Sequence, residues 1–361
     1  MPNENLANAR RARNDEFYTQ YQDIEKEVNA YLDYAPYTFR DKTVLLPCDD
    51  PEWSNFTKYF AQNFERLGLR KLVSTSYAVE SKNYPTDWQP TLFETENPRY
   101  EVEKSRVCGK IFVLDHDTNR NGRIDIEDLQ WEYMQGDGDF RSEEVKLLRD
   151  EADIIVTNPP FSLFREFLAW IMEAKKQFLI IGNMNAITYK ETFPLIMENR
   201  MWLGNGFHAG NAYFAVVKNR DYAEGVYDVD TGLVKFRNCC WFTNLEHGRR
   251  HQPLQLMTME DNLRYSKHKD LRGQKEYLHY DNYDAIEVPY TDAIPKDYED
   301  VMGVPISFLD KYCPEQFEIL DARDFTYINR LKKKNTQLIK DADGAINGKP
   351  TYARVLIRKR K

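Results

Sequence analysis

Residues 153–161 read DIIVTNPPF, and this stretch decides how the rest of the chain is interpreted. Asp153–Thr157 is a short, mostly apolar and β-branched run, which predicts a buried strand. Asn158-Pro159-Pro160-Phe161 ends that strand, because a proline cannot donate to a sheet ladder and so fixes a rigid turn. In open α/β sheets, ligands bind at the carboxyl ends of the strands. We therefore expect a ligand site at this turn, and a plain proline-rich turn is the alternative.

The residues at this turn are suited to methylation of an amino group on a planar ring. The exocyclic nitrogen N6 of adenine is a poor nucleophile because its lone pair is delocalised, and acceptors for its hydrogens would localise that pair. The side-chain oxygen of Asn158 and the backbone carbonyl of Pro159 can be those acceptors. Pro160 would hold the turn, and Phe161 could stack on a base that has left the duplex. Direct transfer from a sulfonium then depends on positioning and needs no nucleophilic side chain.

The segments on either side of this motif alternate between strands and helices. Helical spacing of apolar residues predicts helices over Trp53–Leu67, which Gly68 would end, and over Phe164–Ala174. Short apolar runs predict further strands at Thr43–Leu46, Leu72–Ser74, Ile111–Leu114 and Phe178–Ile181, with Tyr213–Val217 and Cys240–Leu245 closing the sheet. This alternation indicates an α/β fold in which helices cover both faces of a parallel sheet.

The chain after Glu246 has a different character. Charged and aromatic residues mix there, with five prolines between Pro253 and Pro314, so we expect a second, less regular region. A length of 361 residues also allows about two domains. We therefore expect a first domain over residues 1–246, with an insertion near 115–130, and a second region over residues 247–361.

Composition indicates an ordinary globular chain. Hydrophobic residues make up 42% and charged residues 30%, and no apolar run reaches the length of a membrane span. The polar stretch Met1–Asp15 does not look like a secretion signal, so we expect a cytoplasmic protein that has no membrane partner. The five cysteines form no CxxC pair and the six histidines no HExxH spacing, which argues against disulfides and against a zinc site.

The net charge of −8 is unevenly distributed, which matters for a polyanionic partner. Residues 321–361 hold 12 Lys or Arg against 4 Asp or Glu, and phosphate binding needs a local basic surface rather than a basic whole. Basic residues also gather within Leu263–Tyr283 and at Arg249–Arg250, Lys332–Lys334 and Arg358–Lys361. These stretches are either DNA-contacting patches or solvated surfaces, and no base-reading residue can be named.

Motifs along most of the chain form a specific set. They are NDEFYTQ at Asn14–Gln20, LPCDDPEWSNF at Leu46–Phe56, GDGDFRS at Gly136–Ser142, TNPPFSLFRE at Thr157–Glu166, FLIIGN at Phe178–Asn183, MGVPISFL at Met302–Leu309, and residues 346–357. Together they resemble the EcoRI-type adenine-specific DNA methyltransferase family. The resemblance implies a Rossmann-like sheet that binds S-adenosylmethionine, with a DNA-recognition region beside it. It also implies site-specific methylation of double-stranded DNA, either beside a cognate restriction endonuclease or as an orphan or phage enzyme.

By this resemblance, three segments supply the S-adenosylmethionine site. They are Phe17, Tyr18 and Thr19 before the first strand, Cys48, Asp49, Asp50 and Pro51 after it, and Asp139 with Phe140. A carboxylate after the first strand suits the positively charged amino group of the cofactor, and the Asp-Phe pair resembles one that holds the adenine ring. The loop after the first strand lacks the glycines of the wider methyltransferase pattern. From residue types alone, it is equally a turn with an acidic helix N-terminus.

The acidic stretch Asp117–Asp128 reads DTNRNGRIDIED and matches an EF-hand-like calcium loop. Its oxygen ligands would be Asp117, Asn119, Asn121, the backbone carbonyl of Arg123, Asp125 and Asp128. Asp stands at the last position instead of the usual Glu, as in dockerin-type loops, and its shorter side chain should weaken calcium binding. We expect either a calcium loop or a polar surface turn followed by a capped helix.

Other functions fit parts of this pattern. NPP-type motifs also serve methylation of RNA bases and of protein glutamine side chains, because these also present a planar NH2 group. A DNA-binding protein without catalysis is another alternative, and the intact Asn158–Phe161 motif argues against it. A calcium sensor fits less well, because sensors usually use paired loops and the chain has one candidate.

Overall fold

The computed structural model describes residues 18–49, 54–78, 95, 99–207, 211–215, 227–228, 230–320, 345–351 and 354–360. Three residues expected to bind cofactor, Phe17, Asp50 and Pro51, lie outside this part of the chain, as does the basic cluster Lys332–Lys334. The chain divides into two compact units, which are Met1–Ala186 with Met201–His247, and Ile187–Arg200 with Gly248–Lys361. Among the helices that the structure describes, none has both the length and the apolar composition that crossing a bilayer requires.

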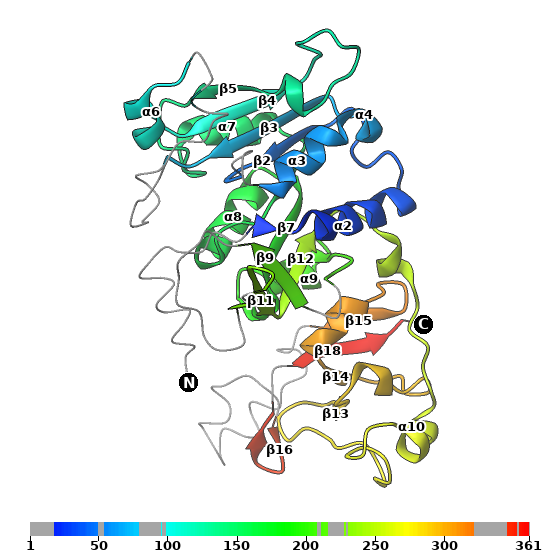
Figure 1. The fold of residues 1–361 in the computed structure, drawn as a ribbon. Coiled ribbons are helices and arrows are strands. Elements are labelled where there is room, and N and C mark those ends of the chain that lie inside the picture. The colour runs from blue at the N-terminus through cyan, green and yellow to red at the C-terminus, as the bar shows by residue number, and fades with distance from the viewer. Residues whose placement is uncertain are drawn as a thin grey trace. The chain divides into compact units, whose positions relative to one another are not determined.

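An eight-stranded sheet forms the centre of the first unit (Figure 1). Its strands, in the order β5-β4-β3-β2-β6-β7-β12-β8, are β2 (Thr43–Leu46), β3 (Lys71–Ser76), β4 (Lys110–Leu114), β5 (Gln130–Tyr133), β6 (Ile154–Thr157), β7 (Gln177–Asn183), β8 (Trp202–Leu203) and β12 (Cys239–Thr243). β3, β2, β6 and β7 run parallel, whereas the outer strands pair antiparallel. The fold is therefore mixed α/β, and the expected parallel arrangement is found only in the four central strands.

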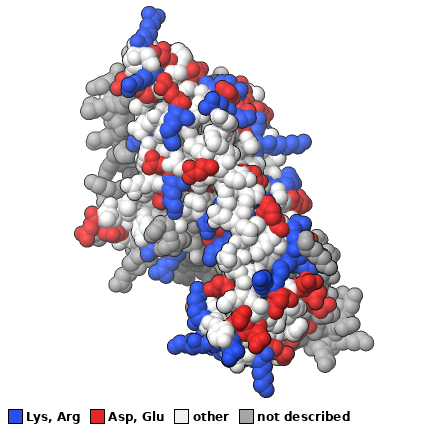
Figure 2. Space-filling view, turned by 90° about the vertical axis from the view of Figure 1, so that its right-hand side faces the viewer, with Lys and Arg blue, Asp and Glu red and all other residues white. Residues whose placement is uncertain are grey.

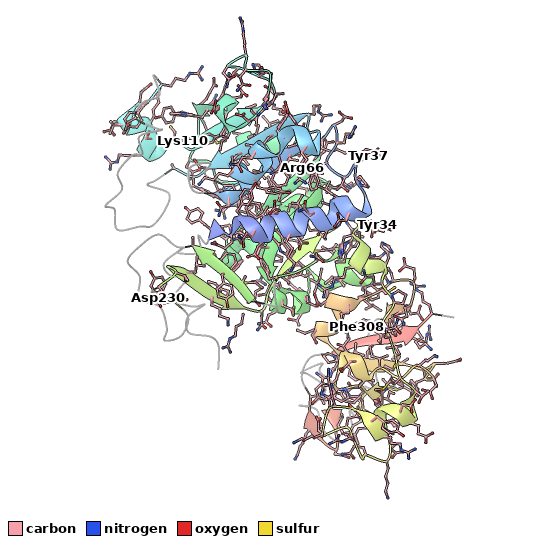
Figure 3. All side chains as sticks on the ribbon, turned by 45° about the vertical axis from the view of Figure 1, so that its right-hand side comes forward. Tyr34, Tyr37, Arg66, Lys110, Asp230 and Phe308 are labelled. Carbon is pink, nitrogen blue, oxygen red and sulfur yellow. The ribbon has the colours of Figure 1, made fainter. Side chains whose placement is uncertain are left out.

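Burial explains why the outer strands differ from the central ones. Every residue of β2 and β6 is buried, as a strand covered on both faces requires. In β4, by contrast, buried and half-buried residues alternate, which is typical of an antiparallel strand with one covered face. Lys110 opens this strand (Figure 3), and its ammonium lies 5.5 Å from the centre of the Trp131 ring on β5.

A second sheet in this unit corrects one expectation. Its order is β1-β9-β11-β10, and its strands are β1 (Tyr18–Thr19), β9 (Asn211–Ala215), β10 (Tyr227–Asp228) and β11 (Leu233–Arg237). β9 was predicted to close the main sheet but pairs antiparallel with β1 and β11 instead. The reason is its alternation: Ala212 and Phe214 are fully buried, whereas Tyr213 is 40% exposed. Such a strand suits a sheet with one covered face.

The helices of the first unit include the two that apolar spacing predicted, one of them interrupted. They are α2 (Tyr21–Tyr34), α3 (Asn55–Gln62), α4 (Phe64–Leu67), α6 (Val102–Val107), α7 (Glu143–Glu151) and α8 (Phe164–Glu173), with the 3₁₀ turns η2 (Ile126–Asp128) and η3 (Phe161–Leu163). A third 3₁₀ turn, η4 (Met184–Thr188), spans the boundary between the two units. The helix predicted over residues 53–67 is divided at Asn63, whose side-chain nitrogen donates to the Tyr59 carbonyl at 2.8 Å. Such a bond competes with the helical ladder. Gly68 ends α4 in the left-handed conformation, with a φ of 65°.

The second unit contains more regular structure than its sequence suggested. Its elements are the strands β13 (Ile286–Glu287), β14 (Met302–Pro305), β15 (Phe317–Leu320) and β18 (Arg354–Lys359), the hairpin β16 (Ala345–Ile346) and β17 (Lys349–Pro350), the helices α9 (Phe193–Met197) and α10 (Met259–Tyr265), and the 3₁₀ turns η6 (Gly248–His251), η7 (Thr291–Ala293) and η8 (Ile306–Lys311). The first four strands form one sheet, in the order β13-β14-β18-β15. Phe308 (Figure 3) is fully buried and packs against Tyr312 and Phe317.

Candidate active site

Asp49 links three strands of the main sheet at their carboxyl ends. The residue is 6% exposed, and its carboxylate accepts hydrogen bonds from the hydroxyls of Ser54 at 2.7 Å and Thr157 at 2.5 Å. Its backbone nitrogen donates to the carbonyl of Thr75 at 2.8 Å, and its own carbonyl accepts a bond from Ser74. Because β2 lies between β3 and β6, these bonds fix the loop after β2 to both of its neighbours.

The same loop brings the β1 segment to this edge. The chain turns at Cys48, whose φ of 69° is uncommon outside glycine. Ser54 then caps α3 by accepting the backbone N–H of Phe56 at 3.1 Å. The side chain of Asn55 donates to the backbone carbonyl of Thr19 at 2.8 Å. Thr19 and Asp49, predicted from separate motifs, therefore lie at one edge of the sheet.

The loop that carries Asp139 packs closely against the end of β3. Gly138 has a φ of 83°, and a Cβ at this position would lie 2.3 Å from the carbonyl oxygen of Ser76, so only glycine fits. The backbone nitrogen of Ala78 donates to the carbonyl of Asp137 at 2.8 Å. These contacts place Asp139 beside the carboxyl end of the strand next to β2.

Tyr77, directly after β3, connects these segments and was not predicted as a site residue. Its hydroxyl accepts the backbone N–H of Phe140 at 3.5 Å. Burial raises the pKa of this hydroxyl far above its ordinary value, and the nearby Cys48 and Asp139 raise it further. Tyr77 is therefore a neutral phenol between two of the predicted cofactor segments. The rule that ligands bind at the carboxyl ends of strands, applied to β3, would have identified it.

Phe140 faces the interior of the unit. It is 1% exposed, and its ring packs edge-on against Phe167 at 5.1 Å and Trp170 at 5.7 Å, both on α8. The adjacent carboxylate of Asp139 is bonded to the guanidinium of Arg141. Stacking of Phe140 on a cofactor ring stays a prediction, and its observed contacts are with α8.

The motif Asn158–Phe161 follows β6 directly. Asn158 is half-buried and Pro159 is buried. The first turn of η3 closes when the backbone nitrogen of Leu163 donates to the carbonyl oxygen of Pro160 at 2.9 Å. That turn uses the carbonyl of Pro160 rather than that of Pro159, the group predicted to accept a hydrogen from the target amine.

Phe161 completes the motif from a half-buried position. Its ring makes edge-on contacts with Phe214 at 6.4 Å and Phe236 at 6.1 Å, on β9 and β11 of the second sheet. The hydroxyl of Thr157, the residue before the motif, is bonded to Asp49. The motif therefore begins one residue from the network that holds the loop after β2.

Two buried hydroxyls belong to segments that are bonded to this edge. Thr19 is 2% exposed and Thr75 fully buried, and neither hydroxyl oxygen has a hydrogen-bond partner among the described residues. Buried polar groups ordinarily have partners, so two unmatched hydroxyls beside one loop are what a polar ligand would complete. Both residues are tied to that loop by their backbone carbonyls, through Asn55 and Asp49.

Comparison with known proteins identifies the family. The model of the adenine-specific methyltransferase EcoRI family matches residues 5–360. The chain belongs to this family. Type II methyltransferase M.EcoRI of Escherichia coli is 39% identical to the chain, across 99% of this chain and 97% of the relative. The type II methyltransferases M.MpnI of Mycoplasma pneumoniae and M.MgeORF184P of Mycoplasma genitalium are 32% and 31% identical, each across 98% of this chain and 97% and 98% of their own lengths. No solved structure matches the chain.

The resemblance inferred from the sequence motifs is thereby confirmed. As a member of the EcoRI methyltransferase family, the chain is an enzyme of the adenine-specific methyltransferases, which use S-adenosylmethionine. The match spans both units, so it includes the region after residue 246 that the sequence set apart.

The acidic loop of this EcoRI-type chain does not gather metal ligands. Among the described residues, no group of three or more His, Cys, Asp or Glu side chains is placed to hold a metal ion. Asp117 instead accepts backbone N–H groups of Asn121 at 3.2 Å and Gly122 at 2.8 Å. Asp128 accepts those of Thr118 at 2.8 Å and Asn119 at 3.1 Å.

The calcium expectation is therefore not supported. It had named Asp117, Asn119, Asn121, Arg123, Asp125 and Asp128 as ligands. Short Asp and Asn side chains readily bond to the backbone a few residues away, and here these bonds shape the loop. Asp125 and Asp128 form a capping box at the start of η2, which is the capped helix that the alternative interpretation expected.

The basic stretches considered for DNA contact differ in how far they are exposed. Arg249 pairs with Asp310 at 2.5 Å, and Arg250 is 4% exposed and bonded to Asn199. Three tyrosines of the stretch after residue 263 are buried in the second unit, whereas Tyr265 is 60% exposed: the buried ones are Tyr277, Tyr280 and Tyr283. The basic residues of the same stretch are exposed: Arg264, Lys267, Lys269, Arg272 and Lys275. On the face drawn in Figure 2, basic and acidic side chains are interspersed.

Proposed function

We propose that the protein methylates N6 of adenine at a specific site in double-stranded DNA, with S-adenosylmethionine as the methyl donor. The observation that carries this proposal is the 2.5 Å hydrogen bond between Thr157 and Asp49. It joins the strand that ends in Asn158–Phe161 to the loop expected to bind the cofactor, which supports neighbouring donor and acceptor sites. The designation of the relatives as type II methyltransferases supports a role beside a cognate restriction endonuclease that acts on the same DNA site.

The proposal assigns different roles to residues 1–246 and residues 247–361. The Rossmann-like arrangement of residues 1–246 is supported by four parallel central strands whose carboxyl ends share one edge, where ligands bind in such sheets. Residues 247–361 would recognise DNA. The exposed basic residues between Arg264 and Lys275 support this second role, because contacts to phosphates supply much of the affinity for DNA.

The cofactor would be held by the segments gathered at this edge. Tyr18 and Thr19, Cys48 and Asp49, and Asp139 with Phe140 would contribute to this site, with Phe17, Asp50 and Pro51 adjoining in sequence. The hydroxyls of Thr19 and Thr75 can bond to polar groups of the cofactor, and Asp139 can accept an N–H of its adenine. Asp49 adds negative charge for the amino group and shapes the loop through its bonds to Ser54 and Thr157. The bound cofactor supplies an electrophilic methyl group on a sulfonium.

Asn158 and Pro159 would act on the target amine. Each offers an oxygen that accepts one N–H of the flipped adenine, which localises the nitrogen lone pair and accommodates the positive charge that develops on nitrogen. Both oxygens follow a fully buried strand, so their positions are fixed before the base arrives. Phe161 would stack on the base, and its own ring is supported by Phe214 and Phe236.

Methyl transfer from radiolabelled S-adenosylmethionine to genomic DNA tests the assignment. Asn158→Ala should lower kcat by about 10²–10³-fold, the usual effect of removing one preorganised hydrogen-bonding group. Asn244→Ala is the matched control, because Asn244 bonds to backbone groups of Phe178 and Lys176 at the amino end of β7. Asn158 instead follows the carboxyl end of β6, which runs parallel to β7. It should lose stability while keeping its kcat. Transfer by Asn158→Ala at the wild-type rate would exclude the proposed role of this motif.

A further inference from the structure

Arg141 forms a bidentate ion pair with the carboxylate of Asp139. Its Nε donates to Oδ1 at 2.9 Å and its Nη2 donates to Oδ2 at 2.6 Å. Its backbone nitrogen donates to Oδ1 at 2.8 Å. This planar fork is specific to arginine, because lysine presents a single point charge. Arg141 therefore sets the orientation of the Asp139 carboxylate.

A further bond ties Arg141 to the helix that follows the catalytic motif. Its Nη1 donates to Oε2 of Glu166 on α8 at 3.2 Å. The guanidinium carbon also lies 5.4 Å from the centre of the Phe140 ring, which packs against Phe167 and Trp170 of the same helix. Asp139 and Phe140 are thus both fixed relative to α8.

Folding stability does not account for this arrangement. The side chains of Asp139, Arg141 and Glu166 are 23%, 48% and 59% exposed, and ion pairs exposed to this degree add little stability. A carboxylate that is kept charged and oriented is, however, a strong acceptor for an N–H of a ligand. The 6-amino group of adenine offers such a donor, whereas a 6-oxo purine presents an oxygen at the same place.

We propose that Arg141 is a positioning residue for the cofactor's adenine. It holds Asp139 so that the carboxylate accepts a hydrogen of the 6-amino group, and it thereby sets a preference for a 6-amino over a 6-oxo purine. This inference rests on the proposed function, in which Asp139 contacts that ring. A carboxylate has about four acceptor positions, and the side chain and backbone of Arg141 occupy three of them, which leaves one for the 6-amino group. Two facing oxygens repel each other, so the 6-oxo ring is disfavoured.

Calorimetry with two ligands tests this inference. S-adenosylhomocysteine and S-inosylhomocysteine differ at position 6 of the purine, and the wild-type enzyme should prefer the first. Arg141→Lys keeps the charge but loses the fork. It should weaken S-adenosylhomocysteine binding by about 10- to 100-fold and change S-inosylhomocysteine binding much less. The KM for S-adenosylmethionine should rise, and kcat at saturation should stay within about twofold of the wild type.

Arg149→Lys is the matched control. Arg149 also packs on α8, with its guanidinium 5.2 Å from the Trp170 ring, but its charge partners are Asp150 and Glu173. This variant should keep the preference between the two ligands. Millimolar guanidinium should partly restore S-adenosylhomocysteine binding to Arg141→Ala.

Two results would overturn the inference. The first is that Arg141→Lys keeps the wild-type preference for S-adenosylhomocysteine over S-inosylhomocysteine. The second is that this variant binds both ligands more weakly by the same factor. A wild-type enzyme that prefers S-adenosylhomocysteine to S-inosylhomocysteine but methylates no DNA would instead overturn the proposed function.

Discussion

Thr157→Val tests whether the bond between Thr157 and Asp49 builds the site. Thr157 is fully buried and valine has nearly the same shape, so the change removes a hydroxyl with little effect on packing. The hydroxyl oxygen lies 2.5 Å from Oδ2 of Asp49 and 2.8 Å from the carbonyl oxygen of Pro47, and it has one proton to donate. The shorter bond, to a carboxylate, is the main loss.

The magnitude follows from that loss. A hydrogen bond to a charged group contributes about 1.5–3 kcal/mol, and Asp49 keeps a second donor, Ser54, at 2.7 Å. A loss of roughly 2 kcal/mol in the free energy of unfolding lowers Tm by about 4–8 °C for a unit of this size. Because the loop after β2 loses one anchor, the Kd for S-adenosylmethionine measured by calorimetry should rise by about tenfold.

Thr243→Val is the control for this measurement. Thr243 is also fully buried, donates to the carbonyl of Phe178 at 2.7 Å and accepts from the backbone nitrogen of Leu245 at 2.9 Å. It lies on β12, away from Asp49, so the variant should melt at a lower temperature and bind the cofactor normally. The reasoning is refuted if Thr157→Val melts within about 1 °C of the wild type, or if both variants lose cofactor affinity equally.

Three further outcomes are expected. Gly138→Ala should lower the free energy of unfolding by roughly 2–4 kcal/mol, because its Cβ would lie 2.3 Å from the carbonyl oxygen of Ser76. Gly122→Ala should lower it by about 1–2 kcal/mol, because Gly122 has a similar positive φ but nothing within 4 Å. Equal losses of stability in denaturant titrations would contradict the packing argument. Burial opposes ionisation of Asp128, but hydrogen bonds from Asn119, Asp125 and Thr118 outweigh it and lower the pKa of this carboxyl below 3.8. The charged carboxylate therefore stabilises the folded protein above pH 3.8, and this stabilisation is lost as the pH falls through the lower pKa of the folded state. Asp128→Asn should therefore lower Tm at neutral pH, by a margin that shrinks as the pH falls below 3.8; a constant margin would argue against this account. Millimolar calcium should leave Tm unchanged, because the acidic loop is closed by its own backbone donors, and a rise in Tm would reveal binding.

The central strands and several helix ends could be predicted from the sequence. Thr43–Leu46 matches β2 residue for residue, and Gly68 ends α4 as expected. These features depend on local properties, namely apolar runs covered on both faces and a left-handed conformation that glycine adopts readily. The break at Asn63 was missed because the apolar spacing continues across it.

The candidate site was harder to predict because its bonds connect distant parts of the chain. In the sequence, an aspartate that follows a strand gives no sign of whether its carboxylate faces a ligand or two hydroxyl groups. The two hydroxyls that donate to Asp49, those of Ser54 and Thr157, lie 5 and 108 positions away along the chain. Tyr77 has no motif of its own, and only its place after β3 marks it. Oxygen spacing over Asp117–Asp128 matched a calcium loop, since spacing does not reveal that the oxygens bond to the backbone.

The long separation between bonded partners has a practical consequence. Thr157 bonds to a residue 108 positions earlier, and the exposed tip of the acidic loop, Asn119–Arg123, lies between the two. A chain cut at that tip yields one piece with Asp49 and another with Asn158–Phe161, and neither piece contains the whole site. Attached to two other proteins, the pieces would become a split reporter in which each encounter leaves a lasting methyl mark on DNA.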